Sequence, residues 1–282
     1  MGQKINATIF RVGFNKNSWN SKYIANNREE SSALVFNDFE IRKYLNNLFN
    51  FFGLIIHNLK INYTKKKILV SLSYFLTLKG VKMLKNIRGL SSPRKTFKRL
   101  PKFVDIILEC LSKFTKYTML IMITFQNLNK NVSLKLSNNF IRTIKRSRTV
   151  LREFNKLHFF NQTMNIIILV ISLKNSSKIL AEFLALQLKT LKNRKFFLYF
   201  LKRTLQIFLS SKSSRIQGIK IVISGRLTQL LRANTIKITV GNVPLQTVKA
   251  KIDYNQQVLY TQNGTFGLKV WVFENKSLYL GN

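Results

Sequence analysis

Hydrophobic positions in the first part of the chain predict one helix followed by a hairpin. In residues 38–52, apolar side chains recur three or four positions apart, and Asn37 stands where a helix cap is expected. Residues 54–62 and 67–74 are typical of two strands joined by a short basic turn. Residues 1–27 have no helical period and predict an extended arm. The expected apolar stripe of the helix consists of Phe39, Tyr44, Leu45, Leu48 and Phe52.

The pattern of the second part predicts helices followed by a sheet. Residues 137–157 have helical spacing, while the β-branched run within 164–173 is typical of a buried strand. Two amphipathic helices are expected at 177–191 and 194–209. Near the carboxyl end apolar and polar residues alternate, which is the period of strands with one covered face. These strands are expected at 219–224, 248–254 and 266–272 and predict an antiparallel sheet.

The segment between the hairpin and these helices has no clear period. Residues 76–136 contain Pro93, Pro101, a basic cluster and an apolar stretch at 103–125. We interpret the segment as an insertion that holds about one helix and one strand.

The net charge of the chain says more about its binding partners than any single motif does. The 282 residues include 48 Lys and Arg but only 10 Asp and Glu, a formal net charge of +38. A fold with that much self-repulsion is stabilised by a polyanion, and nucleic acid is the first candidate because each neutralised phosphate releases counterions. An anionic membrane surface is the second candidate. Residues 57–217 hold 33 of the 48 basic residues and four acids, so the middle of the chain is expected to supply most of the attraction.

Residues for catalysis or metal binding do not form a recognisable set. The one cysteine, Cys110, excludes an internal disulfide, and with His57 and His158 it gives no metal-ligand spacing. No glycine-rich phosphate loop and no nucleophile with a histidine base occurs. The longest apolar run, residues 166–171, is far shorter than the roughly 20 residues that a membrane span needs. We therefore expect no enzyme, no cofactor, no metal and no membrane span.

Short motifs occur in a fixed order at both ends of the chain. Those at the amino end are Met1-Gly2-Gln3-Lys4, Arg11 with Gly13, and residues 19–25 and 38–45. Those at the carboxyl end are Gly218-Ile219-Lys220-Ile221, Ser224-Gly225-Arg226-Leu227, Val243-Pro244-Leu245, and residues 252–254 and 264–273. The ordered set resembles the universal small-subunit ribosomal protein three family over roughly residues 1–74 and 162–273.

That resemblance implies an α+β fold, with a type-II K-homology (KH)-like domain followed by an α/β domain that has an antiparallel sheet. It implies an extended arm at 1–36, a KH-like domain at 37–171 with the insertion at about 76–136, and a carboxyl-terminal domain at 172–282. The helix after the KH loop is expected at 137–157, and the third KH strand at 164–173. The resemblance also implies a structural role in the head of the small ribosomal subunit, where mRNA enters. Its partners there would be rRNA, mRNA and neighbouring ribosomal proteins.

Two departures from the family bear on function. The Gly-x-x-Gly loop of KH domains is missing, since no glycine lies between Gly89 and Gly218. Glycine in that loop lets the backbone approach phosphates closely, so we expect the KH-like domain to be degenerate and to bind RNA by charge and shape without reading bases. The family's Phe-Arg-Arg-Ala-Met-Lys-Arg stretch is Phe-Leu-Tyr-Phe-Leu-Lys-Arg at 197–203, which lacks both arginines of the pair.

Candidate RNA-binding residues are mostly basic. They are Lys4, Arg11, Trp19, Arg94, Lys95, Lys98, Arg99, Arg142, Lys145, Arg146 and Arg226. A basic and aromatic helix face is expected at the mRNA entrance, formed by Lys195, Tyr199, Lys202 and Arg203. For Arg11 and Trp19, packing against the chain's own domain is an equal alternative to RNA contact. For Arg226, simple solvation is an equal alternative to phosphate contact.

The cellular setting follows from where the resemblance begins. It starts at Met1 and leaves no room for a cleaved presequence, so we expect a mitochondrial ribosome with synthesis inside the organelle. A plastid-type organelle or a bacterium is the alternative. Two other functions remain open. A free RNA chaperone or splicing cofactor would share the charge but would not need the ordered motifs. A membrane-surface protein would need an amphipathic basic helix, for which residues 137–157 are the candidate.

Overall fold

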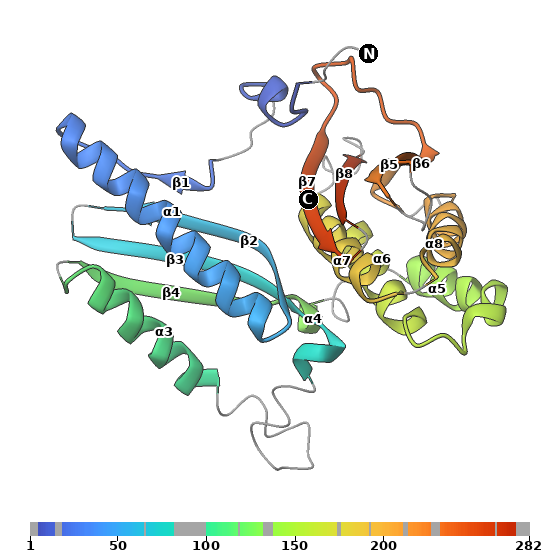
Figure 1. Cartoon of the computed structure of the whole chain (residues 1–282), viewed down its shortest axis with the longest axis horizontal. Helices are drawn as coiled ribbons and strands as arrows, with labels where there is room; N and C mark the ends of the chain where they lie inside the picture. Colours follow the sequence, from blue (N-terminus) through green and yellow to red (C-terminus); the bar gives the residue numbers. More distant parts are fainter. Residues whose placement is uncertain are drawn as a thin grey trace. The chain divides into compact units, whose positions relative to one another are not determined.

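The chain forms two compact units, and one of them is built from both ends of the sequence. The computed structural model describes residues 5–14, 19–64, 66–81, 100–117, 119–131, 138–173, 176–191, 193–210, 214–226, 232–262 and 264–274. The middle unit is Ser18–Asn131. The terminal unit combines Met1–Asn17 with Val132–Asn282. The chain therefore divides after residues 17 and 131, and not after residues 36 and 171 as the sequence led us to expect (Figure 1).

A four-stranded sheet with helices on one face makes up the middle unit (Figure 1). The strands follow the order β1 (Ser21–Lys22), β2 (Leu54–Tyr63), β3 (Lys67–Leu76) and β4 (Leu120–Asn127). The helices are α1 (Arg28–Phe51), α3 (Leu100–Phe114) and the short α4 (Leu128–Asn131). The expected hairpin is confirmed, since β2 and β3 pair antiparallel, whereas β1 and β4 are each parallel to their neighbours.

Helix α1 is longer than the sequence pattern predicted. It starts at Arg28, ten residues before the expected start, and the carboxylates of Glu29 and Glu30 favour its amino-terminal turn. Its buried stripe is Leu34, Ile41, Leu45 and Phe49, whose spacing of seven, four and four keeps one helix face on the sheet. Phe39, which we expected in this stripe, is 65% exposed.

Two charged residues of the 38–45 motif fasten β1 to the rest of the unit. The Nε of Arg42 donates to Oδ2 of Asp38 at 2.8 Å, one helical turn away. Its two Nη atoms donate to the carbonyl of Leu59 on β2 and to the carbonyl of Asn20 and the Oγ of Ser21. The motif that carries the resemblance at the amino end is therefore a structural clamp.

Residues 100–127 complete the sheet, so the prediction of an insertion at 76–136 was wrong for this part. β4 pairs in parallel with β3 from Lys67↔Leu120 to Tyr74↔Asn127. A parallel neighbour needs a crossover connection, and α3 lies in that connection. The prediction of about one helix and one strand in the segment agrees with α3 and β4, and the described residues there also include the short α4.

The run at 164–173, which we expected to be a strand, is helix α6 (Phe160–Ser172) of the terminal unit. An uninterrupted apolar run cannot distinguish a buried helix from a buried strand. The helical signal lies at the edge of this run, whose apolar residues are uninterrupted only over 166–171. Asn161 and Asn165 are the exposed positions and stand four residues apart, on one side of a helix that is otherwise largely buried.

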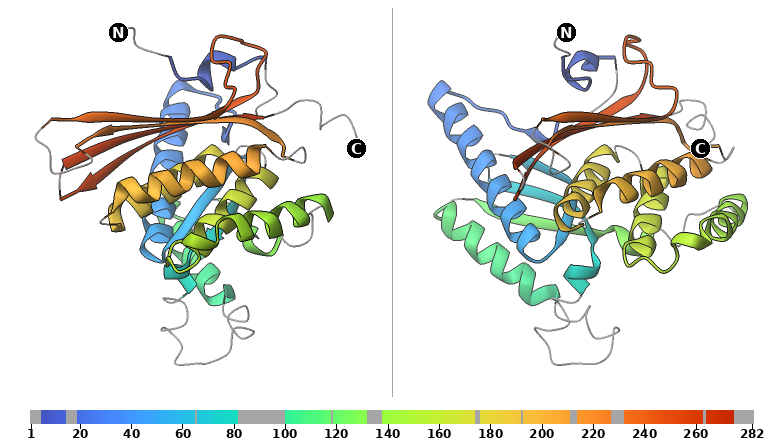
Figure 2. Two further views of the ribbon diagram at one scale, coloured as in Figure 1. Left: turned by 90° about the vertical axis from the view of Figure 1, so that its right-hand side faces the viewer. Right: turned by 45° about the vertical axis from the view of Figure 1, so that its right-hand side comes forward.

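In the terminal unit, helices cover one face of an antiparallel sheet (Figure 2). The helices are α5 (Asn138–Val150), the 3-10 helices η1 (Ile9–Arg11) and η3 (Arg152–Phe154), α6, α7 (Ser177–Thr190) and α8 (Arg194–Leu209). The strands are β5 (Ile216–Gly225), β6 (Asn234–Gly241), β7 (Ile252–Thr261) and β8 (Gly264–Glu274), in the order β6-β5-β8-β7. The sequence predicted α5, α7, α8 and three of these strands but missed β6. The strand expected at 248–254 begins only at Ile252.

Strand alternation produces the core of this unit. The inward residues Ile219, Ile221 and Ile223 of β5 pair with Val272, Val270 and Leu268 of β8, and all six are almost completely buried. Beneath them, α7 contacts β7 and β8 while α8 contacts β5 and β6. α6 in turn contacts α7 and α8.

The amino-terminal arm belongs to the terminal unit and covers one end of the outer face of this sheet. Ala7 joins a small apolar cluster with Ala250, Ile252 and Trp271. The segment is not fully extended, because η1 forms one tight turn in it.

Candidate RNA-binding surfaces

The candidate residues fall into three groups once the structure is considered. Lys4, Arg94, Lys95, Lys98 and Arg99 lie outside the described residues. Trp19 and Arg226 are exposed. Trp19 precedes β1, and Arg226 follows Gly225 at the end of β5. The remaining candidates lie in the terminal unit, on the arm and on two helices.

Arg11 is not available to RNA, which corrects the expectation for this residue. Its side chain is almost completely buried, and Nη1 donates to the carbonyl of Ala7 at 2.9 Å. Nη2 donates to the carbonyls of Leu245 at 2.7 Å and Thr247 at 3.1 Å. Burial lowers the pKa of the Arg11 guanidinium from its ordinary value. The alternative of packing on its own domain is the one the structure shows, and Arg11 fixes the arm to the loop after β6.

The exposed face of α8 brings together the residues expected at the mRNA entrance. Lys195, Tyr199 and Lys202 follow one another at four and three positions and are all exposed. Arg203 stands beside them, and its Nη1 donates to the hydroxyl of Tyr199 at 3.2 Å. The opposite face of α8 is apolar and buried, through Phe197, Leu201, Leu205 and Phe208. The core contact thus fixes which side of the helix carries the charge.

Helix α5 contacts α8 and adds a second row of cations. Arg142, Lys145 and Arg146 are exposed, as expected for a basic helix face. Arg148 is also exposed. The exposed basic residues of both helices together with Tyr199 are hereafter called the α5–α8 surface: Arg142, Lys145, Arg146, Arg148, Lys195, Tyr199, Lys202 and Arg203. Phosphate oxygens are the ligands that such a set of ammonium and guanidinium groups prefers.

Aromatic stacking holds the segment after α5 against α8. The Phe154 ring in η3 lies 5.5 Å from that of Phe196 and 5.0 Å from that of Phe200, measured between ring centres. Its centre lies 6.4 Å from that of Tyr199. Tyr199 therefore belongs to a rigid aromatic group at one edge while its hydroxyl remains at the surface.

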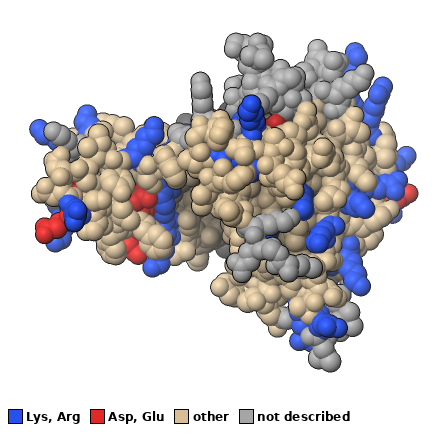
Figure 3. Space-filling view, turned by 90° about the horizontal axis from the view of Figure 1, so that it is seen from above, with Lys and Arg blue, Asp and Glu red and all other residues tan. Residues whose placement is uncertain are grey.

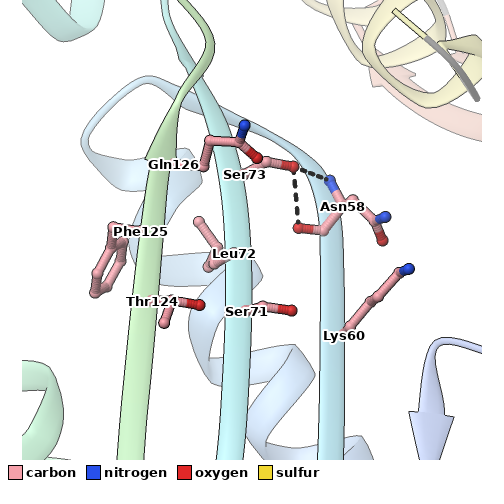
Figure 4. A pocket seen from close by; sticks show the side chains of 8 residues that line it. All are labelled: Asn58, Lys60, Ser71, Leu72, Ser73, Thr124, Phe125 and Gln126. Atoms are coloured by element: carbon pink, nitrogen blue, oxygen red, sulfur yellow. Dashed lines mark hydrogen bonds between the residues drawn. The ribbon is translucent and has the colours of Figure 1, made fainter. Parts of the chain in front are cut away.

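A polar hollow of about 400 Å³ lies on the open face of the sheet in the middle unit (Figure 4). It is lined by Asn58, Lys60, Ser71, Leu72, Ser73, Thr124, Phe125 and Gln126. The Oγ of Ser73 accepts from the backbone N–H of Asn58 at 3.1 Å at the bulge in β2. One cation and several amide and hydroxyl groups give a surface for weak polar contacts, with no nucleophile and base pair.

Three of the four acidic side chains of the terminal unit are partly or fully buried. Its four acids are Glu153, Glu182, Asp253 and Glu274. Asp253 accepts from the backbone N–H of Ser177 at the start of α7 at 2.8 Å, and burial raises its pKa. Glu274 is buried and bonds to Nζ of Lys251 at 2.6 Å. Glu153 is the one exposed acid of this unit, so the surface charge is almost entirely positive.

Glu182 on α7 should make the stability of the terminal unit depend on pH. Burial raises its pKa from 4.5 to about 7, although Nζ of Lys178 lies 3.9 Å from its carboxylate. The folded state then binds more protons than the unfolded state between these values, so stability falls as pH rises through this window. Glu182→Gln should raise the free energy of unfolding by roughly 1–3 kcal/mol at pH 8. Its effect should vanish near pH 4.

Urea unfolding of both proteins across that pH range measures the difference. The matched variant Lys178→Gln should act in the opposite direction, because it removes the cation that favours the ionised carboxylate. An equal pH dependence for the wild type and Glu182→Gln would contradict the assignment.

Other kinds of site are not seen in the described part of the chain. Its residues contain no group of three or more His, Cys, Asp or Glu placed to hold a metal ion. In the same residues, no helix combines the length and hydropathy that crossing a membrane requires.

Comparison with known proteins identifies the carboxyl-terminal part. Residues 189–272 match the family described as "Ribosomal protein S3, C-terminal domain". The small ribosomal subunit protein uS3c of Zygnema circumcarinatum is 43% identical over 104 residues, which are 37% of this chain and 42% of that protein. Its counterpart in Lotus japonicus is 36% identical over 122 residues, 43% of this chain and 53% of that protein.

A bacterial relative agrees with the two plant-lineage proteins. The small ribosomal subunit protein uS3 of Borrelia duttonii is 43% identical over 90 residues, 32% of each chain. In each case the match spans about half or less of the relative's length. Residues 189–272 are thus similar to the carboxyl-terminal domain of ribosomal protein S3, and the chain shares 36–43% identity with parts of the three relatives.

Proposed function

We propose that the chain is a structural constituent of the small subunit of an organellar or bacterial-type ribosome, where it binds rRNA and catalyses no reaction. The α5–α8 surface carries this proposal, because it presents seven Lys and Arg side chains in a unit with one exposed acid. The relatives, which match 32–43% of this chain, are named as small ribosomal subunit proteins. A mitochondrial ribosome remains our prediction, although the relatives named above are chloroplast and bacterial proteins.

We infer that the middle unit is a degenerate type-II KH-like domain, with boundaries that differ from our expectation. Its helix, two antiparallel strands, second helix and parallel third strand support this assignment. The third strand is β4, and the helix before it is α3. The loop that would carry Gly-x-x-Gly precedes α3 within residues 82–99, outside the described residues. The sequence there has a single glycine, Gly89, so binding by charge and shape is the mode we propose.

The α8 face supports a position at the mRNA entrance. Lys195, Lys202 and Arg203 can hold phosphates, and Tyr199 can stack on a base or ribose. Both arginines of the family's pair are replaced here, by Leu198 and Tyr199. Leu198 is buried, so this chain has less charge on the face than its family has. Partners in this position would be mRNA, head rRNA and neighbouring ribosomal proteins.

Sedimentation with ribosomal subunits tests the proposed function. The full chain should migrate with small subunits in a high-magnesium gradient and should be released steeply as monovalent salt rises, because many phosphate contacts give a large counterion term. The triple variant Lys195→Gln, Lys202→Gln and Arg203→Gln should be released at lower salt. Photo-crosslinks from α8 to mRNA in the same particles test the position at the entrance.

A matched control removes charge elsewhere. Lys43 and Lys113 lie on α1 and α3 and are each paired with a glutamate on the same helix. Substituting both with glutamine should leave the release profile nearly unchanged. Recovery of the wild-type chain only in the ribosome-free or membrane fraction would contradict the proposal. Recovery on free RNA alone would favour a chaperone or splicing cofactor.

A further inference from the structure

The outer face of the sheet in the terminal unit carries a group of lysines that the helices leave open. Strand pairing places Lys237 of β6 and Lys269 of β8 on either side of the same residue, Val222 of β5. Paired residues of an antiparallel sheet point to the same face, and neighbouring strands lie about 4.8 Å apart. Both lysines are exposed. Lys220 stands two positions along β5 and therefore points to the same face.

No acidic residue lies on this outer face. Asp253 and Glu274 alternate onto the inner face with the core residues of β7 and β8, and Asp253 bonds to α7 there. Among the described residues, no ion pair involves Lys237 or Lys269. Figure 3 looks onto this side of the terminal unit, where Lys and Arg atoms far outnumber Asp and Glu atoms. Two cations that lie two strands apart on one sheet face repel each other, and a bound anion would relieve that repulsion.

The sheet surface beside the lysines, hereafter the floor, has short polar side chains or none. Ser224 of β5 pairs with Gly267 of β8, and a Cβ at Gly267 would lie 2.8 Å from the Oγ of Ser224. A glycine at this point keeps the backbone accessible from outside. Tyr260 of β7, 73% exposed, borders the floor on the far side together with Val258.

The other end of the outer face is already covered. Ala7 of the arm and Ala250 of the loop before β7 pack there against Trp271 and Ile252. Lys220 lies at the boundary, with its Nζ 5.5 Å from the centre of the Trp271 ring. The open part is therefore a bounded strip, with three cations on one side and an exposed tyrosine on the other.

We propose that this strip, hereafter the lysine strip, is a second RNA-binding surface of the terminal unit. The ammonium groups of Lys220, Lys237 and Lys269 hold phosphates of an RNA strand, and the Tyr260 ring stacks on a base or ribose at the low floor. RNA fits better than a protein partner, because the described residues of this face include three lysines, no acid and only two exposed apolar side chains. The inference rests on the proposed function, and it adds a surface separate from the helices α5 and α8.

Binding of the full chain to a fluorescein-labelled poly(U) strand tests this surface. Anisotropy titrations between about 50 and 200 mM salt give the slope of log K against log salt. The double variant Lys237→Gln and Lys269→Gln should lower that slope by about 1.4 and weaken binding about tenfold or more near 100 mM. Lys43→Gln with Lys113→Gln removes the same charge from the middle unit and should leave the slope unchanged. Tyr260→Ala should weaken binding about fivefold or more at every salt concentration, whereas Tyr260→Phe should not.

The outcomes are distinguishable from failure of the proposed function. Photo-crosslinking of a 4-thiouridine strand should label the β7–β8 hairpin in the wild type and not in the double lysine variant. The lysine strip would be overturned if the double lysine variant kept the wild-type salt slope and the wild type showed no crosslink in that hairpin. If the wild type still sedimented with subunits, the proposed function would stand. Loss of sedimentation by the double lysine variant with an unchanged RNA slope would also overturn the lysine strip, because the face would then dock a protein. Wild-type chain that never sediments with subunits would remove the proposed function itself.

Discussion

Replacing Arg11 with leucine should lower the free energy of unfolding of the terminal unit by about 2–4 kcal/mol. The substitution leaves the carbonyls of Ala7, Leu245 and Thr247 without their donors, and hydrogen bonds to a charged group are each worth about 1.5–3 kcal/mol. The loss is partly offset because the buried guanidinium is no longer desolvated. Arg11→Lys should recover part of the stability, since one ammonium can reach only some of these carbonyls.

The protein provides its own reporter for this measurement. It has two tryptophans, and Trp271 lies in the cluster that the arm covers. In a Trp19→Phe background, urea unfolding followed by fluorescence therefore reports on the docked arm. Arg146→Leu removes an exposed guanidinium and should change stability by no more than about 0.5 kcal/mol. An Arg11→Leu midpoint equal to that of Arg146→Leu would show that the arm is not held by these bonds.

Replacing Gly218 with alanine should lower the free energy of unfolding by about 3 kcal/mol or more. The cause is a steric collision and not the loss of an interaction. Gly218, near the start of β5, pairs with Gly241 at the end of β6, where the chain turns directly into the next loop. A Cβ at Gly218 would collide with the carbonyl oxygen of Asn242, which is backbone and cannot move aside alone. Overpacking a rigid site typically costs about 1–3 kcal/mol and sometimes more. The same urea titration measures the loss.

The variant Gly264→Ala is a control that distinguishes the cost of a steric collision from the cost of backbone strain. Gly264 has φ +117° and nothing within 4 Å of an added Cβ, so its substitution strains only the backbone. That strain should cost about 1–2 kcal/mol. Suppose that Gly264→Ala lowers the free energy of unfolding as much as Gly218→Ala does. The requirement for glycine at position 218 would then not come from the close approach of β5 to Asn242.

The spacing of apolar residues predicted those helices and strands that bury one regular row of side chains. α7 and α8 bury one stripe each, and β2, β3, β5 and β8 alternate, so their positions followed from the sequence. β6 has the same alternation, with Ile236, Ile238 and Val240 inward, and we overlooked it. That omission also hid Lys237, and with it the lysine strip. The charged residues of α8 were predictable, because the same spacing that places Phe197 and Leu201 in the core exposes Lys195, Tyr199 and Lys202.

Long-range pairing was the part that no local pattern could give. The assignment of α6 as a strand placed the third strand of the first sheet in the wrong unit, and β4 was then taken for an insertion. Arg11 looked like an RNA ligand because all but one of its acceptors are backbone carbonyls more than 230 residues away, and no sequence pattern identifies a carbonyl as an acceptor. The buried cation is recognisable only after the loop after β6 is in place.

The docked arm sets an order for folding during synthesis. Arg11 leaves the ribosome 233 to 236 residues before the carbonyls that it binds, which at about 5–20 residues per second is a delay of roughly 10 to 50 seconds. The middle unit is complete at Asn131 and can fold within that delay, while the arm has no docking site. A nascent chain that stalls before Leu245 therefore keeps its first segment undocked and open to proteases, whatever the state of the middle unit. The terminal unit can therefore close only after residues 244–247 have been synthesised.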